Sequence, residues 1–115
     1  MTEEKVAFEN CLGTYIELSL AHITKEDART LDGMIEDGPI SVRDRPGFNG
    51  GEDNGFEIPI YSMEVAPEIW KKHLPKSGLS KPLKKLLTTL RDKKIELLIL
   101  SNWGSVCEDF PVFDW

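Results

Sequence analysis

The sequence predicts an α+β fold, a two-layer sandwich in which helices cover one face of a mostly antiparallel sheet. Apolar and polar residues alternate over 14–20, 40–45 and 56–61, as they do in strands that bury one face. Apolar residues recur every three or four positions over 24–36 and 80–94, as they do in amphipathic helices. The expected order of elements is therefore β-α-β-β-(α)-α-β, followed by a C-terminal tail that docks on the core.

The first strand is followed by a turn that starts a helix over 24–36. Thr24 is placed to accept hydrogen bonds from the amides of the first helical turn. Asp27, three residues further on, is placed to reach back to Thr24, which would complete a capping box. Asp37-Gly38-Pro39 then ends the helix.

The strands predicted over 40–45 and 56–61 form a hairpin. Between them, Pro46 to Gly55 is rich in glycine, asparagine and acids, a composition that predicts a loop at the hairpin tip. Pro59 has no N–H group to donate to a neighbouring strand. We therefore expect Pro59 at a sheet edge or a bulge.

The second half of the chain predicts a helical layer and the centre of the sheet. Pro67 starts a short helix, and Ser80 caps a longer, leucine-rich helix over 80–94. Residues 95–101 are almost continuously apolar, as expected of a central strand buried on both faces. The segment 110–115 contains three aromatic residues and a valine, so we expect it to pack on the core.

The composition fits one small globular domain spanning residues 1–115. The chain is 40% hydrophobic, which is too apolar for disorder, and its length leaves no room for a second core. No apolar run approaches the roughly 20 residues that span a bilayer, so we expect a soluble, cytoplasmic protein without membrane contact. Cys11 and Cys107 fit two reduced structural thiols. The sequence predicts neither a metal site nor a cofactor.

Charge is distributed unevenly along the chain. Residues 1–68 contain five Lys and Arg against fifteen Asp and Glu, whereas residues 69–115 contain nine against five. An acidic surface of this kind would speed association with a basic protein partner. This favours a small, non-enzymatic interaction protein of inhibitor or immunity (anti-defence) type. The alternative interpretation is that each block is the solvated face of an ordinary element.

The residues expected to contact such a partner are Glu52, Asp53 and Glu57 on the hairpin, together with Trp103. Trp103 precedes a glycine in the turn after the last strand, where an exposed indole would serve as an interface residue. Buried packing of the indole is the alternative. The sequence does not set the oligomeric state.

An enzyme is the second hypothesis, with His22 as a general base. His22 lies at a strand end just before a helix N-terminus, and Ser19, Asp27 or Asp44 would have to assist it. A structural histidine that hydrogen-bonds the turn is the competing interpretation. Because no catalytic constellation stands out in the sequence, a non-enzymatic role is favoured.

The third hypothesis is a nucleic-acid accessory protein that uses the basic outer face of the helix over 80–94. The residues concerned are Lys81, Lys84 and Lys85. A net charge of −6 and a pI near 4.9 argue against nucleic acid as the partner.

Three stretches of this chain resemble a known family. They are Leu18 to Asp27, containing Ala-His-Ile-Thr; Leu79-Ser80 at the start of the leucine-rich helix; and the terminal Phe110-Pro111-Val112-Phe113-Asp114-Trp115. These are similar to small uncharacterised bacterial proteins carried on plasmids and integrated elements. Those proteins share an Ala-His-(Ile/Leu)-(Thr/Ser) strand-to-helix turn and end in Leu-Pro-Val-Phe-Asp-Trp.

The resemblance implies a role in conflict between mobile elements and host defences, without an established activity. The chain departs from the family after the last strand, where relatives tend to carry a Phe-Asp-x-Asp-Gly turn. Residues 101–105 read Ser-Asn-Trp-Gly-Ser here. Acidic chemistry at that turn is therefore not expected in this protein.

Overall fold

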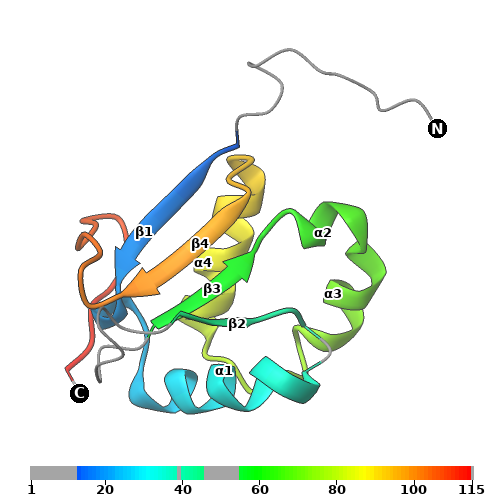
Figure 1. The fold of residues 1–115 in the computed structure, drawn as a ribbon, viewed down its shortest axis with the longest axis horizontal. Coiled ribbons are helices and arrows are strands. Elements are labelled where there is room, and N and C mark those ends of the chain that lie inside the picture. The colour runs from blue at the N-terminus through cyan, green and yellow to red at the C-terminus, as the bar shows by residue number, and fades with distance from the viewer. Residues whose placement is uncertain (1–12, 39, 46–54, 115) are drawn as a thin grey trace.

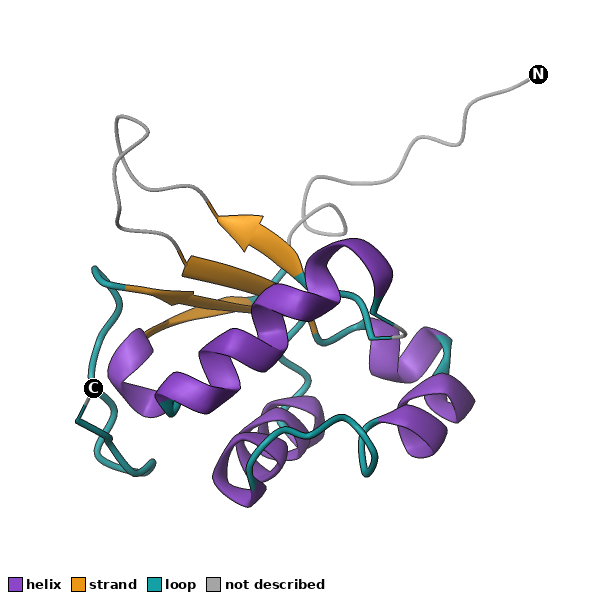
Figure 2. Ribbon diagram, turned by 90° about the horizontal axis from the view of Figure 1, so that it is seen from below, coloured by secondary structure: helices purple, strands orange, loops and turns teal. Residues whose placement is uncertain are grey.

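A computed structural model describes residues 13–38, 40–45 and 55–114 and shows helices packed on one face of a mixed sheet (Figures 1 and 2). The helices are α1 (Lys25–Asp37), α2 (Ser62–Val65), α3 (Pro67–His73) and α4 (Lys81–Asp92); the strands are β1 (Tyr15–Ser19), β2 (Arg43–Arg45), β3 (Gly55–Pro59) and β4 (Leu97–Ser101). A single 3₁₀ turn, η2 (Leu20–His22), joins β1 to the segment before α1. The predicted α+β class is confirmed.

The strand order is β1-β4-β3-β2. β1 runs parallel to β4, whereas β3 is antiparallel to both β4 and β2. β4 is therefore central, as its apolar sequence predicts, and Leu98 and Leu100 are fully buried. The β2–β3 hairpin is confirmed, with Arg43 opposite Glu57.

The core lies between the sheet and the helices. α4 supplies four leucines whose spacing places them on one side of the helix, and all four are buried: Leu83, Leu86, Leu87 and Leu90. Ser80 caps α4 as predicted, because its Oγ accepts a hydrogen bond from the amide of Leu83. Among the described residues, no helix is long and apolar enough to cross a membrane.

The region around the hairpin differs in detail from the prediction. β2 is limited to Arg43–Arg45, although Ile40 and Val42 before it are buried in the core. β3 ends at Pro59, where the Ser62 hydroxyl donates to the Pro59 carbonyl and the chain turns into α2. α2 has only four residues, which are too few for the sequence to predict a helix. Pro59 lies beyond the residues paired with β2, so its missing N–H interrupts no bond to that strand. The loop predicted between β2 and β3 falls largely on 46–54, outside the described residues.

Gly33 lies in the middle of α1, and a methyl group at this position would meet nothing within 4 Å. Alanine lowers the backbone entropy of the unfolded chain and favours helix over glycine by about 1 kcal/mol. We therefore expect Gly33→Ala to raise the free energy of unfolding by about 0.5–1 kcal/mol, measured by urea denaturation. A destabilised Gly33→Ala variant would contradict the position of this helix.

Candidate functional site

The turn between β1 and α1 is hydrogen-bonded to the C-terminal segment. His22 is 2% exposed, and its Nδ1 lies 2.8 Å from the carbonyl oxygen of Pro111. The amide of Cys107 donates to His22 Nε2 at 2.8 Å, and the amide of Phe113 donates to the carbonyl of Ala21 at 2.7 Å. The predicted docking of the tail therefore rests on backbone hydrogen bonds as much as on apolar packing.

These contacts define the tautomer of the His22 ring, that is, which of its two nitrogens carries the proton. Nε2 accepts a hydrogen bond from an amide, so it carries a lone pair, and Nδ1 must hold the proton that it donates to Pro111. The ring of Phe110 stands edge-on to the imidazole, with the centroids 6.1 Å apart. Both ring nitrogens are thus bonded to backbone groups of the C-terminal segment.

The structure does not bring the three predicted assistants to His22. The Ser19 hydroxyl accepts from the amide of Ala21, Asp27 is bonded to Ser80, and Asp44 is exposed on β2. None of these side chains is hydrogen-bonded to the imidazole. Within the part of the chain that the structure describes, no three His, Cys, Asp or Glu side chains are grouped to hold a metal ion.

Asp27 differs from its predicted role. The Thr24 hydroxyl accepts from the amide of Asp27 at 3.0 Å, so half of the predicted capping box is present. The Asp27 carboxylate does not return to Thr24; it accepts from the Ser80 amide at 2.8 Å and from the Ser80 hydroxyl. Asp27 is 2% exposed, and Ser80 is the N-cap of α4. One buried carboxylate therefore joins the N-terminal ends of α1 and α4, where the helix dipoles favour negative charge.

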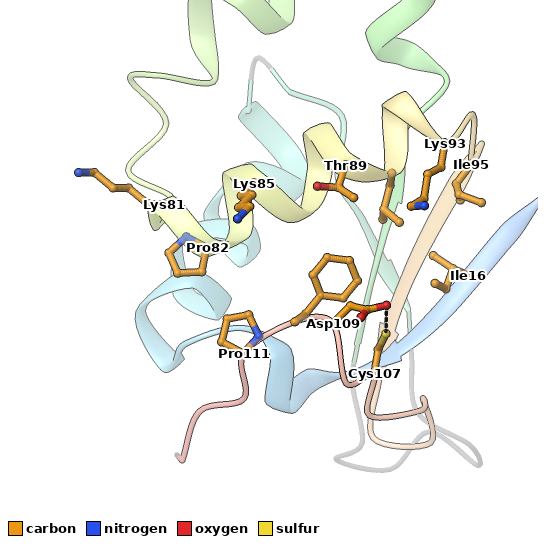
Figure 3. A pocket seen from close by; sticks show the side chains of 12 residues that line it. Ile16, Lys81, Pro82, Lys85, Thr89, Lys93, Ile95, Cys107, Asp109 and Pro111 are labelled. Carbon is orange, nitrogen blue, oxygen red and sulfur yellow. Dashed lines mark hydrogen bonds between the residues drawn. The ribbon is translucent and has the colours of Figure 1, made fainter.

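The main concave feature among the described residues is a groove of about 780 Å³ between α4 and the C-terminal segment (Figure 3). Ile16, Leu90 and Ile95 are among its apolar lining residues. Phe110 and Pro111 line it from the C-terminal segment. Since the hydrogen bonds of His22 fix that segment, they also shape the groove.

Cationic side chains of α4 border this groove, and they are only in part those expected from the sequence. Lys81 and Lys85 line it, whereas the ammonium group of Lys84 donates to the carbonyl of Pro75 at 3.3 Å and is not part of the lining. Lys93 completes the set. Lys93 is the C-cap residue of α4, directly after the last helical residue, and the prediction overlooked it.

The predicted partner-contact residues lie in different environments. Trp103 is 76% exposed, as the interface interpretation requires. Glu57 is partly buried on β3, with a carboxylate oxygen 3.7 Å from the guanidinium of Arg43. Glu52 and Asp53 lie outside the described residues.

The turn that carries Trp103 is closely bonded to β1 and β4. The amide of Trp103 donates to the Ser101 hydroxyl at 3.2 Å, and Ser105 exchanges backbone hydrogen bonds with β1 through Glu17 and Ser19. A Cβ at Gly104 would lie 2.2 Å from the Leu18 carbonyl, so this close approach requires glycine. The indole is therefore exposed on a turn that is fixed in position.

Comparison with known proteins finds a family model that matches most of the chain. The family model described as "Family of unknown function (DUF5983) C-terminal domain" matches residues 15–115. No curated protein and no solved structure matches significantly. The match covers every strand and helix described above, and it confirms the resemblance to an uncharacterised family. The chain therefore belongs to the DUF5983 family of unknown function, within the C-terminal domain of that family.

Proposed function

We propose that this protein is a non-enzymatic interaction domain of inhibitor or immunity type that binds a basic protein partner. The observation that carries the proposal is Trp103, a large aromatic side chain that is 76% exposed on a fixed turn. Tryptophan is the residue most enriched at binding hot spots, and a rigid turn lowers the entropy cost of binding. The resemblance to proteins of mobile elements supports the anti-defence form of this role.

The surface around the end of β4 has the charge that a basic partner requires. Residues 102–114 contain Glu108, Asp109 and Asp114, all exposed, and no lysine or arginine. Val106 and Val112 are exposed in the same segment. β3 is antiparallel to β4, so the chain enters β3 near the point where β4 ends (Figure 1). Glu52 and Asp53 precede that entry in sequence, which is why we include them with Trp103.

The geometry of His22 supports a non-enzymatic role over general-base catalysis. A general base must reach the proton that it removes, and here both imidazole nitrogens are bonded to the backbone at Cys107 and Pro111. The ring is also buried away from solvent. We therefore assign His22 a structural role in holding the C-terminal segment.

The test is capture of a partner with the tagged protein from its native host at low and high salt, followed by calorimetry with the captured protein. We expect Trp103→Ala to weaken binding by about 2 kcal/mol, or roughly thirtyfold, as is typical of a hot-spot tryptophan. Thermal stability should change little, because the indole is exposed. Tyr15→Ala is the matched control, since Tyr15 is an exposed aromatic residue at the other end of β1.

Replacement of Glu108 and Asp109 by glutamine and asparagine should slow association at low salt and have less effect at high salt. The proposal fails if no saturable basic partner is captured at low salt. It also fails if Trp103→Ala and Tyr15→Ala bind the partner equally well.

A further inference from the structure

A row of cationic side chains follows α4 along one wall of the groove. Lys81, Lys85 and Lys93 all line the groove, and the twelve steps from Lys81 to Lys93 correspond to about 18 Å along α4 at 1.5 Å per residue. Lys85 and Lys93 are directed toward the groove, whereas Lys81 lies at one end of the groove and extends away from it (Figure 3). No carboxylate of the described residues forms an ion pair with these three ammonium groups. Within the described part of the chain, the row therefore presents positive charge that no ion pair neutralises.

The rest of the groove is mainly apolar. Ile16, Leu90 and Ile95 contribute aliphatic surface, and Phe110 adds an aromatic ring. One carboxylate, that of Asp109, also lines the groove, 4.0 Å from the Cys107 thiol. Three lysines against one aspartate leave an excess of positive charge beside an apolar surface. A complementary ligand is thus anionic and apolar at the same time.

We propose that this groove binds an acidic, apolar peptide segment of a partner protein in extended conformation. Alternate side chains of an extended chain are about 6.6–6.8 Å apart, close to the roughly 6 Å that separates lysines four residues apart on a helix. Carboxylates on one side of the peptide face the row of lysines, and apolar side chains on the other side contact the aliphatic surface. Trp103 is not among the residues that line the groove, although Asp109 belongs to both surfaces, and this inference does not rest on the proposed function.

The shape of the site favours a peptide over other anions. A row of charges about 18 Å long suits a linear ligand better than a compact one, and a volume of about 780 Å³ is within the usual range of ligand sites. Nucleic acid is less suitable, because the chain carries a net charge of −6 and, among the described residues that line the groove, Phe110 alone offers an aromatic ring on which bases could stack.

The probe for this site is a phage-displayed library of random peptides of about ten residues, a length that exceeds the row of lysines when extended. Selection on the full chain should enrich peptides that combine Asp or Glu with apolar residues. Substituting glutamine for Lys81, Lys85 and Lys93 together should weaken binding of the best peptide about tenfold in fluorescence anisotropy. The matched control carries Lys25→Gln, Lys72→Gln and Lys76→Gln, the same change in charge at exposed lysines outside the groove.

Cys107 supplies an independent readout. In a Cys11→Ser background, bound peptide should slow alkylation of the Cys107 thiol, because that thiol lines the groove. Trp103→Ala should leave peptide affinity unchanged, because Trp103 does not line the groove.

Three results would overturn the inference. The first is enrichment of peptides without acidic residues. The second is equal binding by the groove variant and its matched control. The third is binding of a single-stranded oligonucleotide that is lost in the groove variant while no acidic peptide is enriched. The third result would assign the lysines to nucleic acid.

Discussion

Replacement of His22 by alanine is expected to lower the free energy of unfolding by about 3–5 kcal/mol. The substitution removes the partners of two backbone groups, the Cys107 amide and the Pro111 carbonyl, and an unpaired buried polar group costs about 1–3 kcal/mol. It also leaves a cavity, because the imidazole is almost completely buried and contacts Phe110. Urea denaturation followed by tryptophan fluorescence and by circular dichroism measures this loss.

Two further substitutions separate the hydrogen bonds of His22 from its packing. His22→Phe fills much of the cavity but restores no hydrogen bond, whereas His22→Gln offers both a donor and an acceptor. If the hydrogen bonds contribute more than the packing, His22→Gln should lower the free energy of unfolding less than His22→Phe does. His73→Ala is the matched control, at a partly exposed position on α3.

Release of the C-terminal segment should also be visible chemically. In a Cys11→Ser background, the Cys107 thiol should be alkylated faster when His22 is replaced by alanine, because Cys107 is then no longer held through its amide. A loss of stability below about 1 kcal/mol with unchanged alkylation would contradict the structural role of His22.

Elements with a strong local signal could be predicted from the sequence. The leucine spacing and Ser80 defined α4 to within two residues, and the apolar run at 95–101 identified the central strand. Both signals arise because burial requires apolar residues at regular or consecutive positions within one segment. α2 was missed because four residues are too few to show a period.

The candidate site was only partly predictable, because its contacts join distant segments. The sequence offered His22 either as a general base or as a structural histidine. Its partners are backbone groups at 107 and 111, which cannot be identified from the types of those residues. The groove likewise depends on the C-terminal segment lying opposite α4. Periodicity shows which lysines share a side of the helix, but it does not show what faces them.

The three stretches that carry the family resemblance meet in space, and this explains them structurally. Ala21 and His22 bind the segment that contains Pro111 and Phe113, while Asp27 binds Ser80. The motifs are therefore linked by hydrogen bonds between residues 53 to 92 positions apart in sequence. These hydrogen bonds hold the turn after β1, the start of α4 and the C-terminal segment together.

Asp27→Ala is the second substitution with a large expected effect, a loss of about 3 kcal/mol in the free energy of unfolding. The Asp27 carboxylate accepts two hydrogen bonds from Ser80, and its removal leaves the amide and hydroxyl of that residue without their buried acceptor. Asp27→Asn should cost about half as much, since the amide oxygen still accepts one bond. Asp32→Ala, at an exposed acid on the same helix, should change stability by less than about 0.5 kcal/mol.

A double-mutant cycle tests whether this bond sets the position of α4. Ser80→Ala removes both the cap of α4 and the hydroxyl that donates to Asp27, so the two single losses should exceed the loss of the double variant by about 1–2 kcal/mol. Such a coupling would mean that the N-terminal ends of α1 and α4 are held together by Asp27. A coupling near zero would mean that packing of the α4 leucines alone places the helix, and the lysines beside the groove would then keep their positions without this bond.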